Sequence, residues 1–287
     1  PGVAVIPLPG DIADEEATAD APLYVPVEPG VLQPPASVVQ RLADAINDSD
    51  KVALFVGAGA AGAHDEVIEL AEKIGAPVGH TLRGKEVVQY DNPNDVGMTG
   101  LLGYGAAAEG LDEADLLIML GTDFPYDQFL PDDVTTAQVD TDATVIGRRT
   151  AVDLPVHGDV RATLATLLPL VEAKRKHRFL DQMHKRHDKL MNKAVGAYTK
   201  NVEHKQPIHP EFAASILDQV AADDAIFTAD TGMGNVWTAR YLNPLGTRRL
   251  IGSFLHGSMA NALPQALGAQ LAYPDRQVVS GSGDGGL

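Results

Sequence analysis

Glycine and aspartate residues that follow strand-like runs are the residues of this chain best suited to hold a phosphorylated ligand. Near residue 287, the run 277–280 is followed by Gly283, Asp284, Gly285 and Gly286. Glycines let the backbone close around a diphosphate, and an aspartate can hold the divalent metal that neutralises it. The pattern therefore predicts a metal-assisted diphosphate site at the end of a strand.

Two further segments are expected to reach the same site. Gly257, Ser258 and Met259 precede a predicted helix over residues 260–271, whose N-terminus favours an anion. Gly257 permits close approach of a backbone, whereas Met259, taken alone, is more typical of a core position. Residues 230–234 (DTGMG) follow a predicted strand at 225–228 and are placed to contact the same diphosphate.

A glycine-rich turn marks a second candidate site. Residues 57–62 (GAGAAG), which include Gly57 and Gly59, follow a predicted strand at 52–56 and precede a helix. The spacing matches the turn that carries a dinucleotide diphosphate on a helix N-terminus. An NAD site also needs an acid after the next strand, and none occurs there before Glu86. A purely structural turn and a dinucleotide bound in another way both remain open.

Four more segments lie where ligands gather, beyond the C-terminal ends of predicted parallel strands. Arg83, with Lys85, is suited to phosphate, Asp140 to ribose hydroxyls and Phe124 to a flat ring. Together these segments predict a long ligand across the sheet edge, as a flavin dinucleotide would be. Their candidate contacts are Arg83, Thr99, Gly100, Leu101, Leu102, Gly121, Thr122, Asp123, Phe124, Pro125 and Asp140.

The elements that position these residues alternate between strand and helix, which predicts an α/β fold with a Rossmann-like, doubly wound parallel sheet. Ser37 is expected to cap the first helix and Gly75 to end the second. A basic helical connector, expected to be exposed, separates this region from the first part of a second α/β domain. The predicted strands are 3–8, 52–56, 76–78, 116–120, 137–140, 225–228, 250–251 and 277–280, and 161–172 is predicted to be a closing helix.

Composition excludes several classes of protein. The chain has no Cys, no apolar run of about 18 residues and no basic leader, so disulfides, a membrane span and a signal peptide are not expected. A net charge of −17 argues against a nucleic-acid partner and is typical of a cytoplasmic protein. His184 and His187, with Asp181, have metal-ligand spacing, but their basic segment favours a solvated surface.

Taken together, the motifs resemble one family, the thiamine diphosphate (TPP)-dependent pyruvate oxidases. The resemblance is greatest to the quinone-dependent pyruvate dehydrogenases. It is carried by residues 80–93 (HTLRGKEVVQYDNP), 95–100 (DVGMTG), 121–126 (GTDFPY), 252–262 (GSFLHGSMANA) and 283–286 (GDGG). The resemblance spans almost the whole chain.

The resemblance implies three cofactors: FAD, TPP and Mg²⁺. The residues from Gly57 to Asp140 named above would contact FAD. Gly257, Ser258, Met259, Asp284, Gly285 and Gly286 would contact TPP, with Met259 as the wedge that bends it and Asp284 as a Mg²⁺ ligand. The implied domains are 1–22, the tail of a pyrimidine-binding domain; 23–36, a linker; 37–172, the FAD domain; 173–206, the connector; and 207–287, part of the TPP domain.

By the same resemblance the chain is expected to be part of a longer enzyme, because the activating Glu and the Asn ligands of Mg²⁺ lie in segments it does not include. That enzyme would decarboxylate pyruvate oxidatively and pass electrons through FAD to a quinone, as a homodimer or homotetramer. The longer protein could touch the inner membrane face peripherally. The alternatives are an FAD-containing carboligase of the acetolactate synthase type, a non-catalytic nucleotide-binding module formed by this chain alone, and an NAD-binding scaffold.

Overall fold

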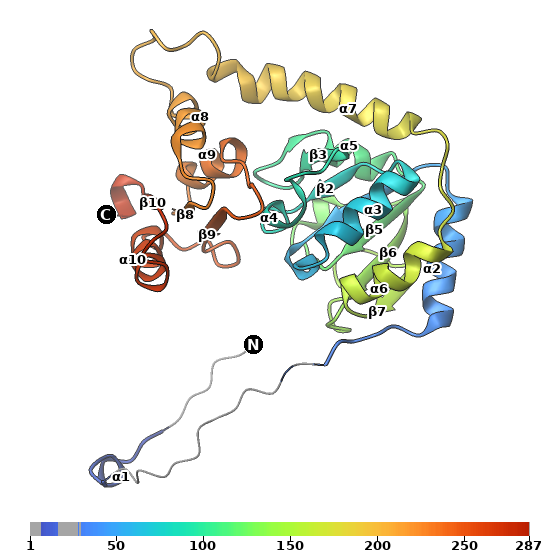
Figure 1. Ribbon diagram of the computed structural model, residues 1–287, viewed down its shortest axis with the longest axis horizontal. Helices are drawn as coiled ribbons and strands as arrows, with labels where there is room; N and C mark the ends of the chain where they lie inside the picture. The colour runs from blue at the N-terminus through green and yellow to red at the C-terminus, as the bar shows by residue number, and fades with distance from the viewer. Residues whose placement is uncertain (1–6, 17–27, 29, 287) are drawn as a thin grey trace. The chain divides into compact units, whose positions relative to one another are not determined.

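The computed structural model describes residues 7–16, 28 and 30–286 (Figure 1). The chain divides into two units, residues 1–31 and 32–287. In the first unit the described part contains one short helix, α1 (Gly10–Ala13). Residues 3–6 of the predicted strand lie outside the described residues, as do residues 23–27 and 29 of the predicted linker.

A seven-stranded sheet organises the first half of the second unit, and it confirms the predicted Rossmann-like fold class. Its strand order is β4-β3-β2-β1-β5-β6-β7, and every pairing is parallel except that of β4. The strands are β1 (Val52–Val56), β2 (Val78–His80), β3 (Asp95–Met98), β4 (Tyr104–Gly105), β5 (Leu116–Leu120), β6 (Thr135–Asp140) and β7 (Leu154–His157).

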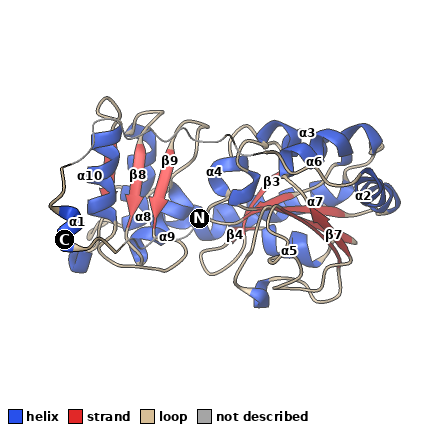
Figure 2. Cartoon of the chain, turned by 90° about the horizontal axis from the view of Figure 1, so that it is seen from below, coloured by secondary structure: helices blue, strands red, loops and turns tan. Residues whose placement is uncertain are grey.

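Helices cover both faces of this sheet (Figure 2). Because side chains alternate along a strand, Leu54 and Ile118 pack under α2, α3 and α6, whereas Phe55 and Leu117 pack under α5 and α7. Burial of each such side chain contributes about 1.5–3 kcal/mol. The helices are α2 (Ala36–Asp48), α3 (His64–Ile74), α4 (Lys85–Val88), α5 (Ala107–Asp112), α6 (Val160–Leu167) and α7 (Arg178–Leu190).

A smaller, three-stranded parallel sheet follows, with the order β10-β8-β9. Its strands are β8 (Ile226–Ala229), β9 (Arg249–Gly252) and β10 (Val278–Gly281), and its helices are α8 (Pro210–Val220), α9 (Met233–Tyr241) and α10 (Ala262–Ala272). The alternation predicted for the second α/β region is therefore present. Among the residues that the structure describes, no helix is long and apolar enough to cross a membrane.

Two local predictions need correction, and a third is confirmed. Helix α2 begins at Ala36, so Ser37 lies inside it and makes no side-chain cap. The closing helix is shorter than 161–172, because α6 ends at Leu167 and a 3₁₀ turn (Leu168–Leu170) containing Pro169 follows. Gly75, by contrast, ends α3 in the left-handed conformation, as predicted.

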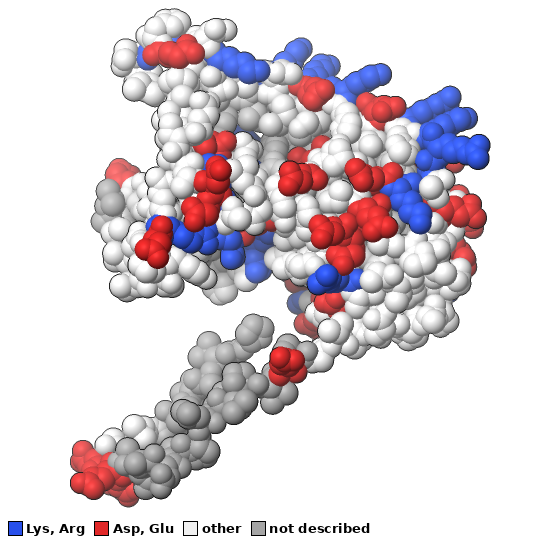
Figure 3. Space-filling model, in the orientation of Figure 1, with Lys and Arg blue, Asp and Glu red and all other residues white. Residues whose placement is uncertain are grey.

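The connector is less exposed than predicted. Phe179, Leu180 and Met183 of α7 are buried, and Phe179 and Met183 belong to the core under α5. The Lys and Arg side chains of this segment gather on its outer surface, where Figure 3 shows them. The prediction failed because three apolar residues within one turn are enough to dock an otherwise basic helix.

Candidate cofactor-binding sites

A cavity of about 340 Å³ lies at the C-terminal ends of β8 and β10. Its walls come from residues 230–234 after β8, residues 282–286 after β10, the side chain of Met259, and Trp237 of α9. The volume lies within the range of small-molecule sites, about 300–1,000 Å³. Three segments that the sequence placed at one diphosphate site are therefore brought together.

Glycines shape this cavity. Gly232 has a φ of 136°, which side chains rarely tolerate. A methyl group at Gly286 would overlap the Oδ2 atom of Asp230, so the backbone of the last loop lies against that carboxylate. A close backbone approach of this kind is what a diphosphate cradle requires.

Asp284 is exposed and begins a 3₁₀ turn (Asp284–Gly286) in this wall. Its Oδ1 accepts the Gly285 N–H at 3.0 Å. The described residues contain no group of three or more His, Asp or Glu side chains that could hold a metal, His184 and His187 included. Mg²⁺ at Asp284 would therefore depend on phosphate oxygens and water for most of its ligands, as Mg²⁺ commonly does.

Met259 projects from a tight turn beside the cavity. Gly257 and Ala260 both have left-handed backbone conformations, with φ of 68° and 56°. Met259 is 66% exposed, and its Cε would lie 3.5 Å from a methyl group placed on Gly285. An exposed methionine beside a glycine-lined cavity is compatible with ligand contact rather than with a core role. Ser258 contributes its carbonyl oxygen, which accepts the Asn261 Nδ2–H.

The second candidate site lies at the C-terminal ends of the paired strands β1 and β5, where the strand order of the seven-stranded sheet changes direction. The loops after these strands touch through their backbones. Gly59 N–H donates to the Gly121 carbonyl at 2.8 Å, and a methyl group at Gly57 would collide with Thr122. These glycines are therefore needed for loop packing, whatever ligand they contact.

The helix after this turn is poorly suited to an anion. A 3₁₀ turn (Ala58–Ala60) follows β1, and α3 begins only at His64. Asp65 and Glu66 occupy the first turn of α3. Two carboxylates would repel a diphosphate placed on this helix N-terminus. The glycine-rich turn therefore lacks the helix contact that its motif predicts.

Arg83 and Lys85, predicted to bind phosphate, have different environments. Arg83 is exposed at the end of β2. Lys85 is buried, and its Nζ donates to the Tyr104 hydroxyl at 3.1 Å and the Ala239 carbonyl at 2.8 Å. Burial lowers the pKa of Lys85 to about 8. Arg83 therefore remains a candidate for binding phosphate, whereas the Lys85 ammonium group is already hydrogen-bonded to protein groups.

The loop that contains Thr99, Gly100, Leu101 and Leu102 borders a cavity of about 350 Å³ through Thr99 and Gly100. Leu101 is 61% exposed, and Leu102 is half-buried. The Thr99 Oγ1 atom is buried and has no hydrogen-bond partner within the described residues. Arg240 of α9 closes the same cavity, donating to the Leu102 and Gly103 carbonyls at 3.2 and 3.1 Å.

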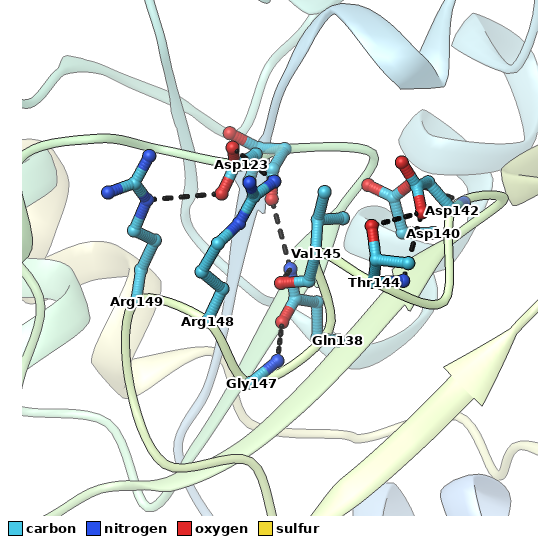
Figure 4. Close-up of polar contacts among 10 residues, drawn as sticks. Asp123, Gln138, Asp140, Asp142, Thr144, Val145, Gly147, Arg148 and Arg149 are labelled. Atoms are coloured by element: carbon cyan, nitrogen blue, oxygen red, sulfur yellow. Dashed lines mark hydrogen bonds and ion pairs between the residues drawn. The ribbon is translucent and has the colours of Figure 1, made fainter.

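The loop after β5 is mostly occupied by protein contacts. Phe124 is only 5% exposed, and its ring meets Phe55 edge-on with centroids 5.1 Å apart. The Asp123 carboxylate pairs with Arg148 at 2.8 Å and Arg149 at 3.1 Å (Figure 4). Thr122 is buried, and Pro125 is exposed. The flat-ring contact predicted for Phe124 would therefore require this ring to leave the core.

Asp140 ends β6, as predicted, close to the same network (Figure 4). Burial raises the pKa of its carboxyl, and the hydrogen bond from the Asp142 N–H to Oδ1, 2.9 Å long, opposes this shift. The side chain of Gln138 bonds to two neighbouring loops: it donates to the Thr122 carbonyl and accepts the Gly147 N–H. Asp140 keeps the strand-tip position that a ribose contact needs.

Comparison with known proteins identifies the family. Residues 39–167 match the family model described as thiamine pyrophosphate enzyme, central domain, and residues 230–287 match the C-terminal TPP binding domain. The two segments cover more than half of the chain, which therefore belongs to the TPP-dependent enzyme family.

Several curated relatives are similar to the chain. A putative thiamine pyrophosphate-containing protein, YdaP, of Bacillus subtilis is 34% identical over the whole chain and 50% of its own length. An acetolactate synthase large subunit of Parasynechococcus marenigrum is 32% identical over the whole chain and 48% of its own length. An uncharacterized 42.6 kDa protein of Pseudomonas amyloderamosa is 48% identical over 63% of the chain and 46% of its own length. The chain thus spans about half the length of these relatives.

Proposed function

We propose that the chain is part of a TPP-dependent enzyme that acts on a 2-oxo acid such as pyruvate, as a carboligase of the acetolactate synthase type. The observation that carries this proposal is the glycine-lined cavity between Asp230, Met259 and Asp284, in the segment that matches the TPP binding domain. The names of several relatives support carboligation better than the oxidation of pyruvate expected from the sequence.

The residues of the cavity fit TPP with Mg²⁺. The backbones of residues 230–234 and 282–286 would hold the diphosphate, Asp284 would hold Mg²⁺, and Met259 would support the bent thiamine. When bound, TPP supplies the electron sink that lets a 2-oxo acid lose CO₂. The chain's own contribution is to orient the diphosphate and to shield one side of the thiamine with an apolar side chain.

We also propose that the edge of the seven-stranded sheet binds FAD, through the backbone at Gly57 and Gly121, the loop at Thr99 and the carboxylate of Asp140. Oxidative decarboxylation of pyruvate with a quinone acceptor is the second candidate function. It is favoured by the runs at residues 80–93 and 95–100, on which the resemblance to pyruvate oxidases depends.

Trp237 offers a direct test of the TPP site, because it is the only tryptophan of the chain and it lines the cavity. Titration with TPP in the presence of Mg²⁺ should change its fluorescence with a saturable dependence, and omission of Mg²⁺ should remove the response. An unchanged signal, together with no heat of binding by calorimetry, would reject the proposed site.

Product analysis separates the two reactions. The protein is incubated with pyruvate, TPP, Mg²⁺ and FAD, with and without a quinone. Acetolactate formed independently of the quinone supports carboligation, whereas acetate formed together with bleaching of the flavin absorption supports oxidation. FAD uptake without either product would identify a nucleotide-binding module that needs further segments for catalysis.

A further inference from the structure

Asp230 has a position in the cavity that the sequence motifs do not explain. It is only 5% exposed at the end of β8. Its Oδ1 atom accepts the backbone N–H groups of Asn261 at 2.7 Å and Ala262 at 2.8 Å. These groups lie at the first turn of α10, so one carboxylate oxygen is fully used as a helix cap.

Asn261 extends this connection into the loop that carries Met259. Its side-chain Oδ1 accepts the Ser253 N–H at 3.1 Å, and its Nδ2 donates to the Ser258 carbonyl at 2.6 Å. The Nδ2 group also reaches Asp230 Oδ1 at 3.3 Å. The loop over residues 253–261 is thus held at both ends by Asn261. Asn261 is in turn hydrogen-bonded to Asp230.

The second oxygen of Asp230 is different. Oδ2 is buried and has no hydrogen-bond partner among the residues that the structure describes. Asp230 itself is one of the residues around the cavity. It lies against Gly286, in the loop that carries Asp284. A buried carboxylate oxygen without a donor is costly, and one beside a diphosphate is repelled by it unless a cation lies between them. Such a cation would reduce the repulsion among Asp230, Asp284 and the diphosphate.

We infer that Asp230 is a positioning residue of the diphosphate site. Its Oδ1 atom fixes the Met259 loop through Asn261, and its Oδ2 atom faces the divalent cation that Asp284 and the diphosphate bind. This inference rests on the proposed function, because it requires TPP and Mg²⁺ to occupy this cavity.

Two substitutions separate the roles of the two oxygens. Asp230→Asn keeps an acceptor for the Asn261 and Ala262 N–H groups but removes the negative charge at Oδ2. Asp230→Ala removes both. Asp275→Asn is the matched control, because Asp275 is exposed in the loop between α10 and β10, at the opposite end of β10 from the cavity.

Mg²⁺ is titrated into each variant at fixed TPP, with Trp237 fluorescence as the signal, and thermal unfolding is measured without ligands. For Asp230→Asn we expect a midpoint of unfolding close to that of the unchanged protein and at least a tenfold higher Mg²⁺ concentration at half-saturation. Asp230→Ala should also unfold at a lower temperature, and Asp275→Asn should change neither quantity.

The outcomes distinguish this inference from the proposed function. Asp230→Asn that binds TPP and Mg²⁺ like the unchanged protein would show that Asp230 is only a helix cap, and would overturn the inference alone. If the unchanged protein gives no Mg²⁺-dependent response to TPP, the proposed function fails, and the inference fails with it.

Discussion

Gly121 lies directly against Gly59, and the two residues join the loops that follow the central strands β1 and β5. Gly121 has a φ of 61°, and its carbonyl oxygen accepts the Gly59 N–H at 2.8 Å. A methyl group on Gly121 would overlap the backbone of Gly59 and Ala60. The loops at the C-terminal ends of these two central strands are therefore held together by a backbone contact that only glycine permits.

Replacement of Gly121 should accordingly destabilise the protein. Gly62→Ala is the matched control, because Gly62 also has a positive φ, of 84°, but has open space around its Cα. Both variants carry the strain of a left-handed alanine, about 1–2 kcal/mol. In urea unfolding, Gly121→Ala should lose at least about 1 kcal/mol more than Gly62→Ala. Equal losses would mean that the loop contact contributes nothing to stability.

Asp284→Asn should weaken Mg²⁺-dependent binding of TPP without destabilising the fold. The side chain is exposed and its one hydrogen bond is to the next residue, so its removal should change the free energy of unfolding by less than about 0.5 kcal/mol. TPP affinity at fixed Mg²⁺, measured by calorimetry, should fall at least tenfold. Unchanged affinity would remove Asp284 from the metal site.

The lowered pKa of Lys85 predicts that the stability of the protein depends on pH. Its pKa is lowered by burial from 10.5 to about 8, so between these values the unfolded chain binds a proton that the folded chain does not. The free energy of unfolding should therefore rise with pH across this window, by at most about 3 kcal/mol. Lys85→Met should lack this rise in urea unfolding at pH 7–10.5.

The control for this experiment is Lys51→Met, because Lys51 is exposed. Its pH dependence should match that of the unchanged protein, since other groups titrate equally in both. A Lys85→Met variant with the same slope as Lys51→Met would show that Lys85 is not buried in its neutral form.

The ion pairs of Asp123 should contribute little to stability. Asp123 is about 30% exposed, and Arg148 and Arg149 are 45% and 34% exposed. Pairs this exposed are worth roughly 0–1 kcal/mol and are screened by salt. Asp123→Asn should lower the free energy of unfolding by no more than about 1 kcal/mol at low salt, and by less in 1 M NaCl. Asp133→Asn, a nearby exposed control, should show no such salt dependence.

The strands that the sequence predicted best are those with continuous apolar runs. Leu116–Leu120 and Val52–Val56 are buried along their whole length, so their composition reports their position at the centre of the sheet. Asp95–Met98 and Leu154–His157 lie further out, and they contain Gly97 and Pro155. Neither short segment has a continuous apolar run, so the sequence pattern could not reveal either strand.

The candidate sites show the same division. Sequence alone placed Asp284, Met259 and residues 230–234 at one site, because each follows a strand of a parallel sheet or begins a helix. It could not show that Asp230 caps α10, because Asn261 lies 31 positions away in the chain. The sequence also could not show that Phe124 is buried, because its ring packs against Phe55, which lies in another strand. Its exposed-ring role toward a ligand was therefore predicted without knowledge of this contact.

Helix α9 connects the two candidate sites. Met233 and Gly234, at its start, form part of the wall of the cavity at the C-terminal ends of β8 and β10. Arg240, near its end, donates to the carbonyl oxygens of Leu102 and Gly103. A nine-residue helix is a stiff rod of about 13 Å. The Thr99–Leu102 loop and the cavity wall are therefore joined through one rigid element of secondary structure.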